Sequence, residues 1–383
     1  MSKLLVITYI PSPYQVELFN AIAVSGEHEL QVAYLQAGCN APIAQQWQQP
    51  EIHHNSIILD NITKYQQLES DLESSDLIIF NYYQHPRIVP LIDRCLKLNK
   101  PWCFWGERPG FKHSGLLGWF YRRWKLASLH ESSAPIWGVG IWGVDRYRQE
   151  FGSDRTYFNL PYFSDLSRFS LSNYDDRQQR IFLYSGALIK RKGVDLLAAA
   201  FAQLAQQFPH IKLHLLGEGE LRPDLESQLI KHQKQVKFFG FQPWDKLPHY
   251  YQQADILCVP SRYDGWGMVV TEGLAAGLPV ISTNRTGAAI ELVENNYNGW
   301  LVDADDQESL YRAMYQAATL STQELATYSQ GASDRALKHS LAHGVGRFEQ
   351  AARETIRQFC LSDRSTILKY QEGEMQFDSA NNQ

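Results

Sequence analysis

The chain has 383 residues, of which 44% are hydrophobic and 20% are charged, and 36 Lys plus Arg against 41 Asp plus Glu give a formal net charge of −5. This composition is typical of a globular protein and excludes a disordered or fibrous chain. The slightly acidic balance argues against a protein that binds nucleic acid, and the length predicts two domains of ~100–200 residues each.

Short apolar runs that end in turn residues alternate with longer segments of helical periodicity. This alternation predicts parallel strands joined by crossover helices. A first series of strands is predicted at residues 3–10, 30–35, 76–80, 102–105 and 135–138. A second series is predicted at residues 180–184, 212–216, 236–239, 256–259 and 279–282. Two series predict an α/β protein with two doubly wound, Rossmann-like domains, whose ligands bind in the cleft at the carboxyl ends of the strands.

The joint between the domains is expected near residue 170, where the stretch 159–165 is followed by a polar segment. We therefore predict a first domain at residues 1–170 and a second domain at residues 171–345. Residues 346–383 are expected to form a C-terminal helix and a polar tail, which from about Ser362 onward has too few apolar residues to pack.

The chain is predicted to be cytoplasmic. Its five cysteines are scattered without any Cys-x-x-Cys pair, which favours reduced thiols over disulfides or a zinc site. No stretch reaches the ~18 apolar residues of a membrane-spanning helix. The first apolar run meets Pro11 rather than a small-residue cleavage site, so a buried strand explains it better than a signal peptide.

A glycine-bearing loop follows the fourth strand of the second series and leads into a predicted helix at residues 268–276. Gly265 and Gly267 allow the backbone to approach a ligand closely, and the amides at the start of the helix favour negative charge. Asp264 lies in the loop, and Glu272 lies eight positions later, about one turn into the helix. Their carboxylates can accept hydrogen bonds from a hydroxyl-rich ligand such as a sugar or a ribose.

Three consecutive cations occupy the loop after the first strand of the second series. Gly186 follows that strand, and Lys190, Arg191 and Lys192 precede the next helix, where their charges would suit a diphosphate. The alternative is a solvated run of charges, since charged side chains usually face water. Gly217 follows the next strand, which is a weak signal alone.

These motifs occur in an order that resembles the retaining glycosyltransferases of family 4, the glycosyl transferases group 1, which have the GT-B fold. The matching stretches are 186–195, 216–219, 236–241, 264–281, 287–293 and 298–299. The first half matches only loosely. The resemblance implies that a sugar passes from a UDP- or GDP-linked donor to a hydroxyl of a glycan, a lipid-linked molecule or a small molecule. It implies front-side transfer with retained anomeric configuration and no cofactor beyond the nucleotide-sugar cosubstrate.

The resemblance also assigns roles to residues. Lys192 and Arg191 would hold the donor diphosphate and stabilise the leaving group. Asp264 occupies the first acidic position of the family's E-x7-E motif, near the donor sugar, and Glu272 occupies the second, on the ribose hydroxyls. The other expected donor contacts are Gly186, Lys190, Gly217, Phe241 beside the base, and the backbone of Gly265, Gly267, Met268 and Val269.

Three positions depart from the family pattern. Asp264 replaces a glutamate, so its side chain is one methylene shorter. Ala187 replaces a frequent arginine, so Lys190 or Arg191 must supply the second cation. Glu107 stands where members often have a histidine near the reacting sugar, and we hypothesise that it is the catalytic substitute. An ordinary loop carboxylate or an ion pair with Arg108 is the alternative.

Four further features have competing explanations. Asp303 and Asp305 match an Asp-x-Asp metal motif, but a helical pattern follows them, so we predict a helix N-cap and no catalytic metal. Tyr14 and His85 are candidate acceptor contacts, although a loop histidine beside a proline is often structural. Residues 112–125 mix aromatic and basic side chains, which fits either a peripheral membrane contact or core packing with a basic rim.

Two other classes of protein remain as alternatives to a transferase. A sugar-nucleotide epimerase of related architecture would need acid and base groups converging on a sugar carbon. A noncatalytic nucleotide-sugar-binding protein would explain why expected positions are substituted.

Overall fold

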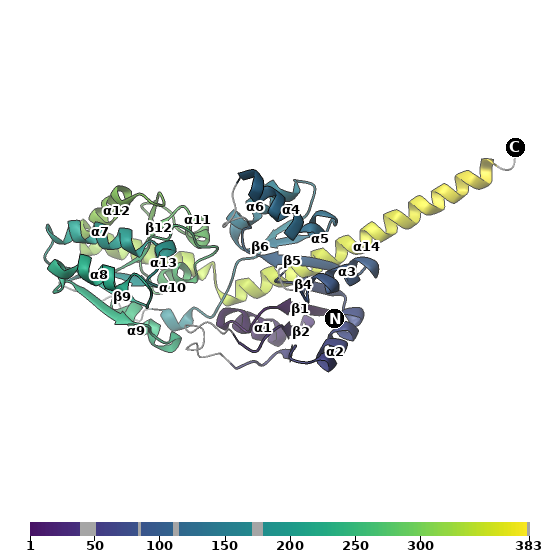
Figure 1. Cartoon of the computed structure of the whole chain (residues 1–383), viewed down its shortest axis with the longest axis horizontal. Helices are drawn as coiled ribbons and strands as arrows, with labels where there is room; N and C mark the ends of the chain where they lie inside the picture. Colours follow the sequence, from purple (N-terminus) through teal and green to yellow (C-terminus); the bar gives the residue numbers. More distant parts are fainter. Residues whose placement is uncertain (39–50, 83–85, 110–114, 171–178, 381–383) are drawn as a thin grey trace.

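The structure is a computed structural model, and it describes residues 1–38, 51–82, 86–109, 115–170 and 179–380. It contains two parallel sheets, each covered by helices, in two domains that lie side by side (Figure 1). The first sheet has seven strands in the order β3-β2-β1-β4-β5-β6-β7, and the second has six in the order β10-β9-β8-β11-β12-β13. In each sheet the order reverses beside the first strand, which is where doubly wound folds bind their ligands.

The strands of the first sheet are β1 (Ser2–Thr8), β2 (His28–Tyr34), β3 (Asn55–Ile58), β4 (Leu77–Phe80), β5 (Trp102–Gly106), β6 (Ile136–Gly138) and β7 (Tyr157–Asn159). Those of the second are β8 (Arg180–Ser185), β9 (Ile211–Leu216), β10 (Val236–Gly240), β11 (Ile256–Val259), β12 (Val280–Thr283) and β13 (Gly299–Val302). The central strands β4, β5 and β11 are buried along their whole length, because helices cover both faces of the sheets.

The helices of the first domain are α1 (Pro13–Ser25), α2 (Ile62–Ser74), α3 (Val89–Lys97), α4 (Gly115–Lys125), α5 (Ala127–His130) and α6 (Gly140–Phe151). The second domain contains α7 (Val194–Ala205), α8 (Arg222–Gln228), α9 (Leu247–Gln252), α10 (Met268–Ala275), α11 (Gly287–Leu292), α12 (Gln307–Thr319) and α13 (Thr322–Leu337). A last helix, α14 (Leu341–Ala380), follows them.

The expected fold class is confirmed, and every strand that the sequence predicts is present. The prediction misses β3, β7 and β13. All three are short strands at the edge of a sheet. An edge strand has a single neighbour and needs fewer apolar residues, so its hydrophobic signal is weak.

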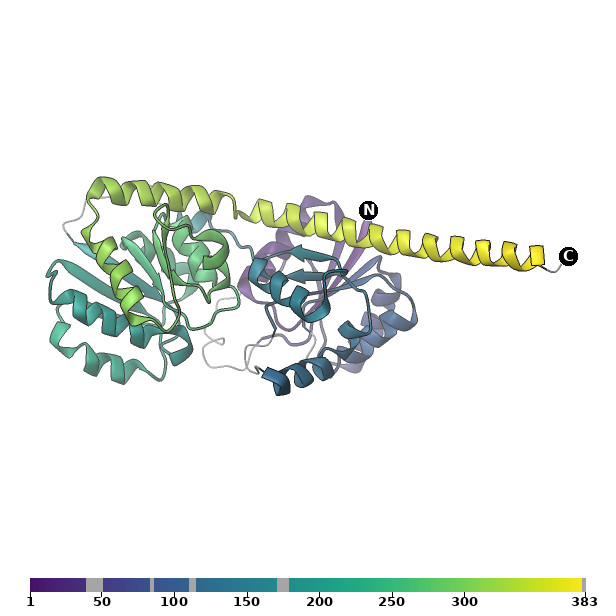
Figure 2. The same cartoon turned by 90° about the horizontal axis from the view of Figure 1, so that it is seen from above.

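The last helix crosses from the second domain back to the first, and Figures 1 and 2 both show it lying along the first domain. Phe348 packs against Trp105 and Trp137, and Trp137 Nε1 donates to Thr355 Oγ1 at 3.2 Å. The helix begins at Leu341, five residues before the expected boundary. The helix continues to Ala380, through the segment that the sequence analysis describes as a polar tail.

The segment between the two sheets is anchored to the first domain. Asn159 ends the first sheet and Arg180 begins the second, so residue 170 lies between them. Glu17 of α1 accepts from the backbone N–H of Asp165 at 2.8 Å and pairs with Arg168. These contacts fix the linker against the first domain.

Candidate active site

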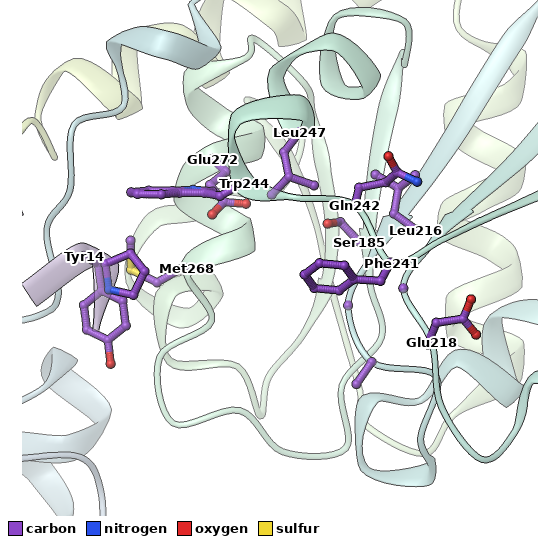
Figure 3. Close-up of a pocket in the computed structure, with 14 residues that line it drawn as sticks. Tyr14, Ser185, Leu216, Glu218, Phe241, Gln242, Trp244, Leu247, Met268 and Glu272 are labelled. Atoms are coloured by element: carbon purple, nitrogen blue, oxygen red, sulfur yellow. The ribbon is translucent and has the colours of Figure 1, made fainter. Parts of the chain in front are cut away.

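A cavity of about 400 Å³ lies between the two domains (Figure 3). Pro13 and Tyr14, at the start of α1, form its wall on the first domain. The remaining lining residues belong to the second domain: Ser185, Gly186, Ala187, Leu216, Gly217, Glu218, Phe241, Gln242, Trp244, Leu247, Met268 and Glu272. In Figure 3 Tyr14 and Met268 lie at one end, Glu218 lies at the other, and Phe241 and Trp244 lie between them.

The close approach of two strand ends shapes the floor of this cavity. Gly217 follows β9 with φ +123, and a Cβ there would lie 2.0 Å from the carbonyl oxygen of Gly186. The N–H of Gly186 donates to the carbonyl of Leu216 at 3.0 Å. A glycine is therefore required at 217, and both expected glycines border the cavity.

The glycine-bearing loop leads into α10 as the sequence predicts. Gly267 is the N-cap with φ +90, and α10 begins at Met268 and ends within one residue of the expected position. Met268 borders the cavity, whereas the half-buried Val269 does not. A Cβ on Gly267 would lie 3.4 Å from Asp264 Oδ2, so this turn brings the first carboxylate next to the helix N-terminus.

The three cations of the 190–192 loop point to different partners. Lys192 Nζ pairs with Asp264 Oδ2 at 2.5 Å, and both side chains are mostly buried. Arg191 donates to the backbone carbonyl of Tyr263 at 2.8 Å. Lys190 is 67% exposed and pairs with Asp195 at 2.6 Å. Lys190 therefore faces solvent, as the alternative of a solvated run of charges predicts, whereas Lys192 is turned toward the cleft.

Glu107 reaches the same place from the end of β5 in the first domain. A Cβ on Gly265 would lie 1.9 Å from Glu107 Oε2, so the carboxyl group rests directly on the backbone of that glycine. Burial and the nearby Asp264 raise the pKa of Glu107, while a hydrogen bond from Tyr162 and the charge of Lys192 act in the opposite direction. Two carboxylates and an ammonium thus meet across the cleft.

The alternative ion pair between Glu107 and Arg108 is not formed, because the Arg108 guanidinium stacks on Trp142, 4.4 Å from the ring centre. Glu107 is therefore positioned by its contacts with the second domain and not by its sequence neighbour.

Glu272 borders the cavity from α10. Its Oε2 accepts a hydrogen bond from the hydroxyl of Tyr251 at 2.8 Å. Burial raises the pKa of Glu272 to about 6. A carboxylate in a partly apolar cavity is well suited to accept hydrogen bonds from hydroxyl groups of a ligand.

Several lining residues were not identified from the sequence. The Arg168 guanidinium stacks on Trp244 at 4.0 Å from the ring centre, and the Gln242 side chain is held between Tyr250 and the carbonyl of Phe239. No motif marks these positions, because the loop after β10 forms the wall only through its tertiary packing. Phe241, which was expected beside a base, lines the same wall.

The structure places one of the two candidate acceptor contacts. Tyr14 borders the cavity, and its ring lies 4.7 Å from that of Tyr162. His85 lies outside the described residues.

The prediction that Asp303 to Asp305 form a helix N-cap is wrong. The residue that caps α12 is Asp306, whose Oδ1 accepts from the N–H groups of Glu308 and Ser309 at 3.0 Å each. Asp303 instead accepts from Asn284, and Asp305 pairs with Arg262. The two aspartates bind protein partners because the chain turns once more, with φ +65 at Asp305, before the helix begins.

The second domain matches a known family. Residues 169–332 fit the model of the glycosyl transferases group 1. This part of the chain is a group 1 glycosyl transferase domain.

Curated relatives match over part of the chain. An uncharacterised glycosyltransferase of Methanocaldococcus jannaschii is 32% identical over 138 residues, which are 36% of this chain and 38% of the relative. Mannosylfructose-phosphate synthase of Agrobacterium fabrum is 29% identical over 157 residues, or 38% of this chain and 34% of the relative. The chain thus spans less than two fifths of the length of these relatives.

Solved structures match almost the whole chain. Anabaena HepE in complex with UDP and glucose has a TM-score of 0.72 and 17% identity, and it covers 92% of this chain and 100% of its own. Sucrose-phosphate synthase of Thermosynechococcus elongatus has a TM-score of 0.72 and 19% identity over 94% of this chain and 100% of its own. The two-domain architecture is the GT-B fold, and the first domain, for which the family model gives no match, shares it.

Proposed function

We propose that the protein is a retaining, metal-independent glycosyltransferase that moves a sugar from a nucleotide-sugar donor to a hydroxyl acceptor. The observation that carries this proposal is the convergence of Lys192, Asp264 and Glu107 across the cleft, beside a cavity that contains Glu272. The family of the second domain and the UDP bound in the HepE structure support a nucleotide-sugar as the donor.

In this proposal the nucleoside occupies the cavity. Its base packs near Phe241, and the ribose hydroxyls donate to Glu272. When the diphosphate binds, Lys192 leaves Asp264 and pairs with the diphosphate. Arg191 and the first backbone amides of α10 donate further hydrogen bonds to it. Asp264 is then free to accept hydrogen bonds from the donor sugar.

The transfer step forms a bond between the acceptor oxygen and the anomeric carbon while the bond to the leaving phosphate breaks. Negative charge builds on the phosphate, where Lys192 and Arg191 stabilise it. Positive charge develops on the sugar, close to the carboxylates of Asp264 and Glu107. The acceptor proton passes to the leaving phosphate oxygen, so the nucleotide leaves on the face that the acceptor approaches, and the configuration is retained.

A donor screen tests this function. The protein is incubated with UDP-, GDP- and ADP-sugars, with and without glycan, lipid-linked and small-molecule acceptors, and nucleoside diphosphate release is measured with and without a chelator. We expect acceptor-dependent release that the chelator does not reduce and that falls at least ~100-fold in Lys192→Ala and Glu272→Ala. Lys231→Ala, an exposed lysine of the same domain, is the matched control. Full activity in both site variants would overturn the assignment.

The two alternative functions give different results in the same screen. An epimerase would convert the sugar of the donor without acceptor and without nucleotide release. A noncatalytic protein would bind the donor and leave it intact. The ion pair beside the cavity favours transfer, because it places cationic charge where a diphosphate would leave.

We also propose that α4 contacts a membrane surface peripherally, at the inner face of a membrane in the cytoplasm. Six large apolar or aromatic side chains of this helix are between 40% and 86% exposed: Leu116, Leu117, Trp119, Phe120, Tyr121 and Trp124. They do not pack in a core. Arg123 and Lys125 lie among them, with Lys125 Nζ 4.8 Å from the ring centre of Trp124. Aromatic and basic side chains on one short helix fit an anionic lipid surface.

The helix is held to the protein by its opposite side, where Arg122 donates to Glu150 at 2.8 Å. Of the expected contact region 112–125, the structure describes residues 115–125. No helix in the described ranges is long and apolar enough to cross a membrane.

Sedimentation with liposomes tests the membrane proposal. We expect the protein to pellet with vesicles that contain anionic lipid and to remain in the supernatant in a Leu117→Glu/Trp124→Glu variant. Val24→Glu, an exposed apolar residue of α1, is the control and should leave binding unchanged. Equal sedimentation of the wild type and the double variant would contradict the proposal.

A further inference from the structure

Arg262 lies two residues before Asp264, in the loop between β11 and α10, but it does not line the cavity. Its side chain is 17% exposed and forms a two-pronged ion pair with Asp195 of α7: Nη1 donates to Oδ1 at 2.6 Å and Nη2 donates to Oδ2 at 2.9 Å. Its Nε pairs with Asp305, the second aspartate of the Asp-x-Asp pattern. Two carboxylates therefore fix the orientation of this planar guanidinium.

Arg262 also joins its own loop to the 190–192 loop. Its Nη1 donates to the backbone carbonyl of Lys190 at 2.6 Å, and its backbone N–H donates to the carbonyl of Arg191 at 2.9 Å. In the opposite direction, Nη1 of Arg191 donates to the backbone carbonyl of Tyr263 at 2.8 Å. Hydrogen bonds in both directions thus connect the two loops along their backbones.

The two backbones also approach each other closely. Gly193, directly after the 190–192 loop, has φ +70, and a Cβ there would lie 1.8 Å from the carbonyl oxygen of Pro260. Loops packed so closely have little room to slide, so the contacts of Arg262 fix the spacing between them. The same two loops carry Lys192 and Asp264, whose Nζ and Oδ2 are 2.5 Å apart.

This connection matters most when the ion pair between Lys192 and Asp264 opens. In the proposed function Lys192 leaves Asp264 to pair with the diphosphate, so this ion pair no longer holds the loops together. The side-chain contacts of Arg262 involve neither the Lys192 ammonium nor the Arg191 guanidinium, so they can persist in the donor complex. Groups that stabilise a leaving phosphate act best when they are held in place before the reaction.

We propose that Arg262 is a positioning residue for the donor diphosphate: it holds the 190–192 loop in place, so that Lys192 stays directed at the leaving phosphate after it has left Asp264. The inference rests on the proposed glycosyl transfer and adds a residue that acts through Lys192 without touching the donor. The ion pair between Lys190 and Asp195 belongs to the same network, which gives the exposed cation of the loop a supporting role.

The first test compares the binding of a nucleoside diphosphate with that of its nucleoside. UDP, GDP and ADP and their nucleosides are titrated by NMR, which follows affinities in the millimolar range. The nucleoside lacks the diphosphate and reports the cavity alone. In Arg262→Met we expect the Kd of the tightest diphosphate to rise about 10-fold, while the Kd of its nucleoside stays within about twofold of wild type.

A conservative variant and a control accompany Arg262→Met. Arg262→Lys keeps the positive charge but cannot form the two-pronged pair, so its diphosphate Kd should lie between those of wild type and Arg262→Met; it replaces the methionine variant if that protein does not fold. Arg335→Met removes an ion pair with Glu294 at 2.8 Å elsewhere in the second domain and should change neither affinity. An unchanged diphosphate Kd in the Arg262 variants, or an equal loss for diphosphate and nucleoside, would overturn the proposal.

A double-variant cycle tests whether Arg262 acts through Lys192. In Lys192→Ala the ammonium that Arg262 positions is missing, so adding Arg262→Met should raise the diphosphate Kd by no more than about threefold. A full ~10-fold further loss would show that Arg262 acts independently of Lys192 and would refute its role. The same cycle measured on kcat at saturating donor should give the same pattern.

The binding measurements need no turnover, so two kinds of failure remain distinguishable. A wild-type protein that binds none of the three diphosphates contradicts the proposed function, and the inference fails with it. A wild-type protein that binds one of them, with the same affinity in the Arg262 variants, contradicts the inference alone.

Discussion

The carboxyl group of Glu272 is expected to reduce the stability of the empty protein. Its pKa of about 6 in the fold, against 4.5 for an ordinary glutamate, is equivalent to about 2 kcal/mol of free energy. Because the pKa is raised, the folded state binds the proton more tightly than the unfolded state. The stabilising effect of protonation is fully present below pH 4.5 and is lost as pH rises through 6.

The variant Glu272→Gln removes this titration and keeps an oxygen that can accept the hydrogen bond from Tyr251. We expect the free energy of unfolding to increase by up to about 2 kcal/mol at pH 7 and to change little at pH 4.5. Urea denaturation of both proteins at several pH values measures the difference. Donor binding should weaken at the same time, since a neutral amide is a poorer acceptor for ribose hydroxyls than a carboxylate.

The control for Glu272→Gln is Glu220→Gln, which changes a carboxylate near the cleft that is exposed, and its stability difference should not vary with pH. A Glu272→Gln protein that is less stable than wild type at pH 7, or whose stability difference is the same at pH 4.5 and pH 7, would refute the reasoning.

Three further variants test other contacts. Gly265→Ala places a Cβ where Glu107 Oε2 now lies, so we expect kcat to fall at least ~10-fold while the melting temperature changes by a few degrees at most; additive losses when it is combined with Glu107→Gln would contradict a shared cause. Gly217→Ala meets a backbone carbonyl and should lower the free energy of unfolding by about 2 kcal/mol or more, which chemical denaturation measures. Arg122→Met leaves the buried Glu150 without its shortest ion pair and should cost about 2–3 kcal/mol, and a loss below 0.5 kcal/mol would show that other groups satisfy Glu150.

The sequence by itself determined the fold class and the donor side of the site. The central strands β4, β5 and β11 are continuous apolar runs, because both faces of a parallel sheet are buried, and such runs are visible without a structure. The helix that follows Asp264 and contains Glu272 was predicted within one residue at each end, because glycines and helix boundaries are local signals.

Only the tertiary structure decided which side chains meet. Lys190, Arg191 and Lys192 are equivalent in the sequence, but packing turns Lys192 to Asp264 and leaves Lys190 exposed. Glu107 meets Gly265, which lies 158 positions later in the chain, and no local pattern encodes that contact.

The edge strands and the last helix follow the same division. β3, β7 and β13 form because a neighbouring strand offers hydrogen bonds, and α14 returns to the first domain because Trp105 and Trp137 present an apolar surface there. Local periodicity and turn residues depend on neighbours within a few positions, so the sequence reveals them. The site at the cleft depends on contacts between distant segments, and those exist only once both domains have folded and packed together.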